Sequence, residues 1–370
     1  MQTKKRNKVN KLALVFISLM LFGISLPSSA WAGYTYTEII PPDWQWAEAW
    51  AINDGGAIIG WGYDVNDFIK GFLYSGGNYT EIIPPAWQWA GALAINDGGA
   101  IVGGGDDANG FTKGFLYSGG NYTDIIPPAW KSADAWAIND GGAIVGVGKD
   151  VNGVEKGFLY SEGNYTEIMP PDWLWAEAWA INDGGAIVGG GDANGVEKGF
   201  LYSGGNYTEI IPPDWMVAYA YAINDSGAIV GGGYDGNDVG KGFLYREGNY
   251  TEIMPPDWLW AEAYAINDGG AIIGWGYDVN DFIKGFLYSK GNYTEIIPPA
   301  WKGAWANAIN GDGAIVGGGY DANDVLKGFI ATLQSVCTTW TDVISKYNAY
   351  VIGQAVWNEV ITCYNQYASE

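Results

Sequence analysis

The sequence predicts an all-β fold, a seven-bladed β-propeller built from four-stranded blades. Three observations lead to this prediction. The 370-residue chain contains seven copies of one unit, the copies recur every 42 or 43 residues, and each copy holds four short strand-like segments separated by turn signals. Four strands per unit of about 40–45 residues is typical of a propeller blade. The diproline that marks each copy starts at residues 41, 84, 127, 170, 212, 255 and 298.

Each copy alternates apolar segments with turn residues. "AWAIN" alternates small and larger side chains, as a first strand does, and "DGG" after it indicates a hairpin turn. "AIIGWG" and "KGFLYS" predict the second and third strands, on either side of a polar loop. "YTEII" predicts the fourth strand, which ends at the prolines because proline lacks the N–H that a ladder needs. In the first copy these four predicted strands are residues 49–53, 57–62, 70–75 and 79–83.

The two ends of the repeat region predict ring closure. "YTYTEII", which begins at residue 34, is a fourth strand without the other three, and the last copy ends at "KGFIATL" with no fourth strand. We therefore expect the N-terminal strand to complete the seventh blade, which removes the exposed sheet edges of an open array. This places the propeller at residues 33–333.

The repeat resembles a known family. "AINDGGAIVGGG" (180–191) followed by "KGFLYSGGNYTEI" (198–210) is similar to the HAF repeat of extracellular bacterial proteins. "KGF" stands in every copy where that pattern has its His-Ala-Phe triplet. The resemblance covers roughly residues 34–333 and implies an extracellular propeller. It implies no catalytic residues.

The N-terminal residues predict export. A basic stretch, "MQTKKRNKVNK", precedes fifteen apolar residues and the small-residue pattern "PSSAWA". This is the pattern of a signal peptide cleaved after Ala32, so residues 1–32 are predicted to be removed and the protein to be secreted or periplasmic. The alternative is an uncleaved anchor, although the apolar run is short for a membrane span.

The last 37 residues, 334–370, follow a different pattern from the repeats. Apolar residues fall at helical spacing in "WTDVISKYNAYV" and again in "WNEVITCYNQYA", which predicts a helical hairpin. Cys337 and Cys363 are the only cysteines, and in an exported protein such a pair is more often a disulfide than a metal site. The hairpin is interpreted as a stapled cap, with a partner-binding or surface-attachment module as the alternative.

Composition argues against several classes of function. The formal net charge is −23, so nucleic acid and anionic lipid are poor partners. The chain contains no His, and Arg246 is the only Arg beyond the predicted signal peptide, which removes the commonest general base and the usual bidentate anion clamp. The acids recur in every copy, whereas catalysis needs one distinctive site. We therefore expect no enzyme and no cofactor.

Three positions after each diproline, called the first, second and third slots, differ in how much they vary among the seven copies. The first slot is Trp in every copy and is interpreted as a structural wedge between blades. These structural tryptophans are Trp44, Trp87, Trp130, Trp173, Trp215, Trp258 and Trp301. The second slot drifts from Trp to Ser, Val or Gly, and is interpreted as an exposed position. The third slot holds Trp, Leu, Tyr or Asn.

A binding face is predicted around the second slot. Propeller topology places the diproline segments and the polar second-to-third-strand loops on one face. Exposed aromatic rings with nearby carboxylates suit sugar rings, so an extracellular polysaccharide or a surface protein is the expected partner. The candidate ligand-binding residues are Trp46, Glu48, Trp89, Asp134, Trp175, Glu177, Trp260 and Glu262.

The polar loops, such as "DVND", raise the question of calcium. An Asp followed two residues later by Asn begins like a calcium loop, but no distant Glu completes it. An Asx turn is the favoured interpretation, with a calcium site at Asp64 and Asn66 or at Asp278 and Asn280 as the alternative. The "NYT" sequons fall in hairpin turns, where Asn is favoured for backbone reasons.

The sequence therefore favours an exported, non-enzymatic propeller that binds a partner through one loop face. The first alternative is a structural or adhesive surface protein in which seven similar loops give many weak sites. The second is a glycan-active enzyme using paired carboxylates.

Overall fold

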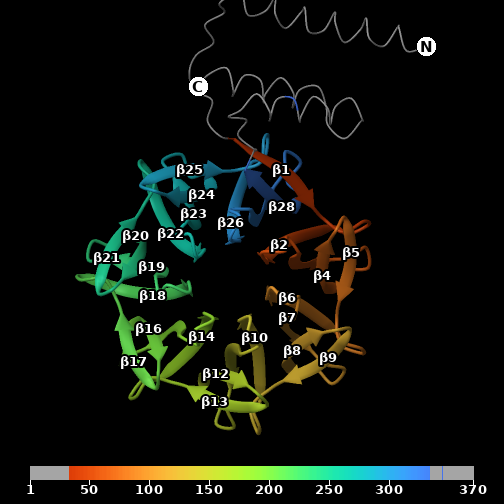
Figure 1. Ribbon diagram of the computed structural model, residues 1–370, viewed down its shortest axis with the longest axis vertical. Coiled ribbons are helices and arrows are strands. Elements are labelled where there is room, and N and C mark those ends of the chain that lie inside the picture. The colour runs from red at the N-terminus through yellow and green to blue at the C-terminus, as the bar shows by residue number, and fades with distance from the viewer. Residues whose placement is uncertain (1–32, 334–343, 345–370) are drawn as a thin grey trace, which may run out of the picture. The chain divides into compact units, whose positions relative to one another are not determined.

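The computed structural model describes residues 33–333 and residue 344. Residues 34–333 form seven four-stranded antiparallel sheets arranged as blades around a central axis (Figure 1). This confirms the predicted seven-bladed, all-β propeller. The predicted signal peptide, C-terminal helical hairpin and Cys337–Cys363 disulfide lie outside the described residues. Nowhere in residues 33–333 or at residue 344 is there a helix long and apolar enough to span a membrane.

Each blade orders its strands from the axis outward. The innermost strands are β2 (Trp46–Ile52), β6 (Trp89–Ile95), β10 (Ser132–Ile138), β14 (Trp175–Ile181), β18 (Trp215–Ile223), β22 (Trp258–Ile266) and β26 (Gly303–Ile309). The second strands are β3 (Ile58–Tyr63), β7 (Ile101–Asp106), β11 (Ile144–Lys149), β15 (Ile187–Asp192), β19 (Ile229–Asp235), β23 (Ile272–Asp278) and β27 (Ile315–Tyr320). The third strands are β4 (Ile69–Ser75), β8 (Thr112–Ser118), β12 (Glu155–Ser161), β16 (Glu197–Ser203), β20 (Gly240–Arg246), β24 (Ile283–Ser289) and β28 (Leu326–Leu333). The outer strands are β5 (Asn78–Ile82), β9 (Asn121–Ile125), β13 (Asn164–Ile168), β17 (Asn206–Ile210), β21 (Asn249–Ile253), β25 (Asn292–Ile296) and, for the last blade, β1 (Tyr34–Ile39).

Strand β1 closes the ring. It pairs antiparallel with β28, in register from Tyr34 opposite Leu333 to Ile39 opposite Gly328. The seventh blade therefore has the order β1-β28-β27-β26, as the phase of the repeat predicts. Blades are numbered 1 to 7 from β2, so that blade 7 is the one completed by the N-terminal strand.

The ring has two faces with different connections. The diproline connections and the loops between second and third strands share one face, called the loop face below; the backbone N–H of Gln45 donates to the Tyr63 carbonyl across it, at 2.9 Å. The "DGG" and "GGN" turns make the opposite face, called the turn face. This arrangement agrees with the prediction from propeller topology.

The first strand begins earlier than predicted. It starts at Trp46 and not at Ala49, so Trp46 and Glu48 belong to the innermost strand and not to a loop. A register shift between Ala49 and Ala51 leaves Trp50 as a bulged residue. A β-bulge re-aims a side chain, so the bulge sets the direction of the third slot in every blade. Gly60 lies opposite, where a Cβ atom would be 1.9 Å from the Glu48 carbonyl oxygen.

Apolar side chains fill the space between neighbouring blades. Phe72 is fully buried, and the Trp44 ring meets it edge-on at a centroid distance of 6.0 Å. The same cluster contains Ile39 and Val316 of blade 7, so Trp44 lies between blades 7 and 1. The first-slot tryptophans of the other blades meet the equivalent phenylalanines in the same way.

Hydrogen bonds join the blades at their inner and outer ends. At the inner end the amide of Asn53 donates to the Asn96 carbonyl of the next blade, at 3.0 Å. This bond repeats around the ring until Asn310 donates to Asn53. At the outer end the N–H of Ile83, just before the prolines, donates to the Tyr122 hydroxyl at 3.1 Å. In blades 2 to 6 the tyrosine of the "NYT" segment therefore ties the outer strand to the preceding blade.

Candidate functional site

The loop face carries the exposed large apolar side chains of the propeller. Within residues 34–333, every such side chain except Leu333 projects from a loop-face connection or from the loop-face end of a first or second strand. They are Val65, Phe68, Phe111, Val151, Leu174, Val196, Met216, Tyr234, Leu259, Tyr277, Val279, Phe282 and Tyr320. One face of the ring is thus apolar at its loop tips, and the opposite face is not.

The second-slot tryptophans are not exposed, contrary to the prediction. Trp46, Trp89, Trp175 and Trp260 are all half-buried. Trp46 packs against Trp61 and Tyr63 of its own blade, both at 5.0 Å between ring centroids. The earlier start of the first strand explains the difference, because the slot lies within the sheet.

In blades 6 and 7 the second-slot residue is matched in size to a residue of the preceding blade. A Cβ atom at Gly240 of blade 5 would lie 1.9 Å from Cδ1 of Trp260 in blade 6. A Cβ atom at Gly303 of blade 7 would lie 2.4 Å from Cγ2 of Ile283 in blade 6. A large residue on one side of these two blade interfaces is therefore matched by a glycine on the other.

The predicted carboxylates lie in the innermost strands and are buried or half-buried. Glu48 is 7% exposed and accepts hydrogen bonds from Trp305 Nε1 and, at 2.9 Å, from Asn307 Nδ2 of blade 7. Burial raises the pKa of Glu48 above its usual value, although both hydrogen bonds favour the ionised form. Glu48 thus joins blade 1 to blade 7.

The other three carboxylates are also held in blade interfaces. Burial and the neighbouring Glu155 carboxyl raise the pKa of Glu177 to about 7, and Trp179 Nε1 donates to Glu177 at 2.7 Å. Burial and the charge of Asp106 raise the pKa of Asp134 to about 6. Burial raises the pKa of Glu262, although the Tyr221 hydroxyl donates to it at 3.1 Å. These acids have perturbed pKa values, but they do not gather around one reacting position.

The bulged aromatics of the third slot pack against one another across successive blades. Trp179 and Tyr221, and then Tyr221 and Tyr264, pack at 5.7 Å between ring centroids across successive blades. The third slot of blade 7 is Asn307, which donates to Glu48 and to the Ala49 carbonyl. This slot therefore serves contacts between blades.

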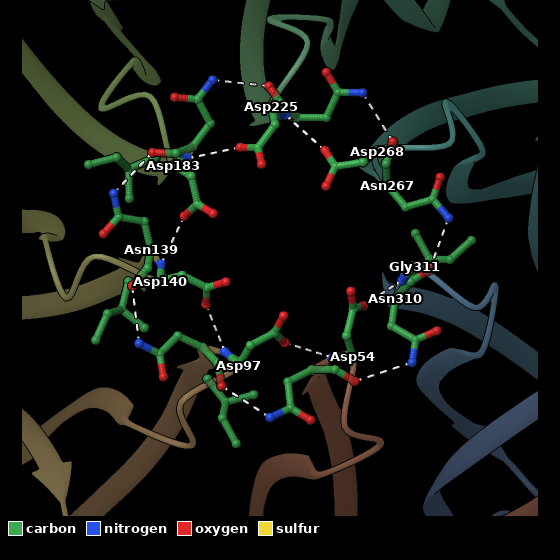
Figure 2. A pocket seen from close by; sticks show the side chains of 18 of the residues that line it. Asp54, Asp97, Asn139, Asp140, Asp183, Asp225, Asn267, Asp268, Asn310 and Gly311 are labelled. Carbon is green, nitrogen blue, oxygen red and sulfur yellow. Dashed lines mark hydrogen bonds between the residues drawn. The ribbon is translucent and has the colours of Figure 1, made fainter.

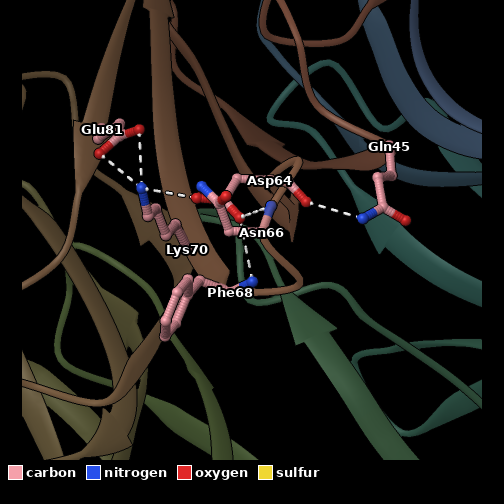
Figure 3. Close-up of polar contacts among 6 residues, drawn as sticks. All are labelled: Gln45, Asp64, Asn66, Phe68, Lys70 and Glu81. Carbon is pink, nitrogen blue, oxygen red and sulfur yellow. Dashed lines mark hydrogen bonds and ion pairs between the residues drawn. The ribbon is translucent and has the colours of Figure 1, made fainter.

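The second-to-third-strand loops form Asx turns (Figure 3). The Asp64 Oδ1 atom accepts the N–H groups of Asn66 at 2.8 Å and Phe68 at 3.1 Å. Lys70 Nζ lies 3.0 Å from Asp64 Oδ2 and 3.0 Å from Glu81 Oε1. Partial desolvation raises the pKa of Asp64, but these hydrogen bonds outweigh that effect and hold the pKa below its usual range.

The same arrangement recurs at the second position of the calcium alternative. Asp278 accepts the N–H groups of Asn280 and Phe282, and Lys284 Nζ lies 3.0 Å from its Oδ2. In both loops a lysine ammonium therefore lies where a cation would have to bind. Among the residues that the structure describes, no group of three or more Asp, Glu, His or Cys side chains is placed to hold a metal ion.

The turn face contains a central cavity that the sequence analysis did not single out (Figure 2). It has a volume of about 300 Å³ and is lined by the Ile-Asn-Asp segments that end the first strands. Six aspartates surround it, and in blade 7 Gly311 replaces the seventh. Each carboxylate accepts a backbone N–H from the preceding blade; for example, Asp97 accepts from Asp54 at 2.8 Å. The repeated "IND" segment was the available signal.

The residue that follows each first-slot Trp is a further feature of the loop face, and its exposure was not predicted from the sequence. It is Leu174 in blade 4, Met216 in blade 5 and Leu259 in blade 6, and all three side chains are exposed. In the other blades the same position is Gln45, Gln88, Lys131 and Lys302. Comparison of the seven copies at this position would have found the difference.

Comparison with known proteins supports the fold. No family model matches the sequence, and no curated protein matches it. The β-propeller domain of the Trilobed protease from Pyrococcus furiosus is similar in structure, with a TM-score of 0.57 and 10% identity over 78% of this chain and 95% of that one. The acylaminoacyl peptidase of Pyrococcus horikoshii has a TM-score of 0.54 and 13% identity over 83% of this chain, but only 55% of the peptidase is covered. At these identities the likeness shows a shared propeller fold.

Proposed function

We propose that this chain is an exported, non-enzymatic binding module whose loop face engages a protein on an extracellular surface. The observation that carries the proposal is the segregation of exposed large apolar side chains to that face. Concentrated apolar side chains on one face of a strongly acidic chain are characteristic of an interaction surface. Export is supported by the signal-peptide pattern and by the resemblance to the HAF repeat.

Two features support binding over catalysis. The candidate acids Glu48, Asp134, Glu177 and Glu262 make their contacts between blades, in four different blade interfaces. The chain also lacks His. A glycan-active enzyme would need two carboxylates facing one substrate position.

A polysaccharide is the second candidate ligand. It is favoured by two aromatic groups that reach the loop face, one of Trp46, Trp61 and Tyr63 and one of Trp260, Trp275 and Tyr277. Tyr277 is 39% exposed. The aliphatic character of Val65, Val151 and Leu174 at the tips favours the protein partner.

Binding of residues 33–370 to immobilised extracellular surface proteins and to a glycan panel would test this function. A loop-face variant would carry Ser at Val65, Phe111 and Val151 and Gln at Leu174, Met216 and Leu259. A turn-face control would carry Ser at Glu162 and Glu247. We expect wild type and control to bind surface proteins and the loop-face variant to lose binding. Equal binding by all three would contradict the proposal.

A further inference from the structure

Three neighbouring blades differ from the rest at one exposed loop-face position. The residue after the first-slot Trp is aliphatic only in blades 4, 5 and 6, as Leu174, Met216 and Leu259. Their exposed fractions are 60%, 46% and 52%. Blades 4 to 6 are adjacent in the ring (Figure 1), so the three residues occupy the same position in three successive blades; they are called the apolar arc below.

Three of the four equivalent polar residues are held by their own blades. Gln45 Nε2 donates to Asp67 Oδ1 at 2.7 Å and to the Asp64 carbonyl at 3.1 Å. Gln88 donates to the Ala108 carbonyl, and Lys302 pairs with Asp324. These contacts fold the polar side chains onto the second-to-third-strand loop. An aliphatic side chain cannot form them, so the arc is left free to contact a partner.

Each aliphatic residue of the arc has an exposed carboxylate two residues before it. Asp172, Asp214 and Asp257 stand at φ values of 66°, 64° and 64° and are exposed. Blade 1 also has an aspartate at this position, Asp43, whereas blades 2, 3 and 7 have Ala86, Ala129 and Ala300. The arc therefore combines apolar side chains with regularly placed negative charge. In blades 3 and 7 the position of the apolar residue is instead taken by Lys131 and Lys302.

We propose that the apolar arc binds a cationic amphipathic segment of a partner protein. The apolar side chains of that segment would cover Leu174, Met216 and Leu259, and its Lys or Arg side chains would lie beside the three aspartates. Complementary charge of this kind sets the choice and orientation of a partner. A second copy of this chain would present the same acidic face and be repelled. This inference rests on the proposed function and specifies its partner.

A displayed library of random peptides, selected against residues 33–370, would test the inference. Enriched peptides would be measured against wild type, against an arc variant (L174Q, M216Q and L259Q) and against a tip variant (V65S, F111S and V151S). Gln is a suitable replacement because blades 1 and 2 carry it at the same position. Thermal melting would confirm that both variants are folded.

We expect enriched peptides to combine Lys or Arg with apolar residues and to bind more weakly as salt is raised. The arc variant should bind them about tenfold more weakly or worse, as expected when central apolar anchors are lost. The tip variant should bind them as wild type does.

Three outcomes would overturn the inference. Enrichment of neutral or acidic peptides would show that the partner segment is not cationic. Equal weakening by the arc and tip variants would locate binding over the whole loop face, which leaves the proposed function intact. Undiminished binding by both variants would locate binding elsewhere and contradict the proposed function as well.

Discussion

At the scale of single residues, the buried Asn of each "IND" segment has two tasks. Asn139 Oδ1 accepts the Ala143 N–H at 2.8 Å and closes the turn, while its Nδ2 donates to the Asn182 carbonyl of the next blade at 3.1 Å. The sequence indicates the turn, because "DGG" is a local signal. It does not indicate the link, because the accepting carbonyl is 43 residues away and becomes a neighbour only in the folded ring.

Replacing Asn139 with Ala should therefore destabilise the propeller. The substitution leaves the Ala143 N–H without its partner and removes the bond to the Asn182 carbonyl, which then accepts only the Gly185 N–H. An unsatisfied donor of this kind costs about 1–3 kcal/mol. Denaturant unfolding would measure the change. N164A, in an exposed hairpin turn, is the matched control and should cost roughly 0.5 kcal/mol or less. Equal effects of the two substitutions would contradict the role assigned to the Asn ring.

The carboxylates in the blade interfaces predict how stability depends on pH. The pKa values of Glu177, about 7, and Asp134, about 6, lie above the values near 4 expected in the unfolded chain. The folded protein therefore holds more protons, so the stabilisation from these groups is complete below about pH 4 and is lost as pH rises toward 7. Thermal melting should give a higher midpoint at pH 5 than at pH 8.

Glu177→Gln isolates this effect. Gln can still accept from Trp179 but cannot ionise, so we expect E177Q to be more stable than wild type at pH 8, by on the order of 1 kcal/mol after discounting for solvent screening. The difference should vanish or reverse at pH 4. If the stability of E177Q depends on pH just as that of wild type does, the Glu177–Glu155 pair does not control the pH dependence.

At the scale of strands and blades, side-chain size is matched across interfaces. The repeat period and turn residues are sufficient to predict the strand types, their order and the loop face. The predicted exposure of Trp46 and Trp260 is wrong because both residues lie within a first strand and not in a loop. The Trp260 ring also lies against Gly240 of the preceding blade. Gly240 and Trp260 are 20 residues apart in the chain, and only the folded interface shows that one makes room for the other.

Substitution at Gly240 tests this matching. We expect G240A to destabilise the propeller by about 1–3 kcal/mol, because overpacking forces neighbouring groups to move. In combination with W260A the cost of G240A should shrink, giving a measurable coupling in a double-mutant cycle. Gly91 is the control, since a Cβ there meets Trp61 only at 3.8 Å, and G91A should change stability little. Additive effects of G240A and W260A would contradict the contact.

At the scale of the whole molecule, the N-terminal strand makes the ring continuous. The half-units at the two ends of the repeat region predict this closure, because β1 lacks a blade of its own and β28 lacks an outer neighbour. Which residues that differ between blades are exposed could not be predicted from the sequence. The apolar arc of Leu174, Met216 and Leu259 is one such difference. Its exposure depends on the neighbouring loops, which are placed only in the folded ring.

Deletion of residues 33–39 should open the ring at blade 7. The exposed edge of β28 would then favour aggregation, and the thermal midpoint should fall. A synthetic peptide with the sequence "YTYTEII" should raise the midpoint again by pairing with β28, whereas a scrambled peptide should not. A deletion variant that melts like the protein with residues 33–39 would contradict the closure role.

The claim that the loop face is the binding surface is tested most directly by carboxyl footprinting. Residues 33–370 would be labelled with a carbodiimide, free and bound to the extracellular surface proteins that retain it, and mass spectrometry would compare labelling on the two faces. The account predicts that Asp172, Asp214 and Asp257 become protected while Glu162 and Glu247 on the turn face stay reactive. Protection of Glu162 and Glu247, with the three aspartates unchanged, would contradict it.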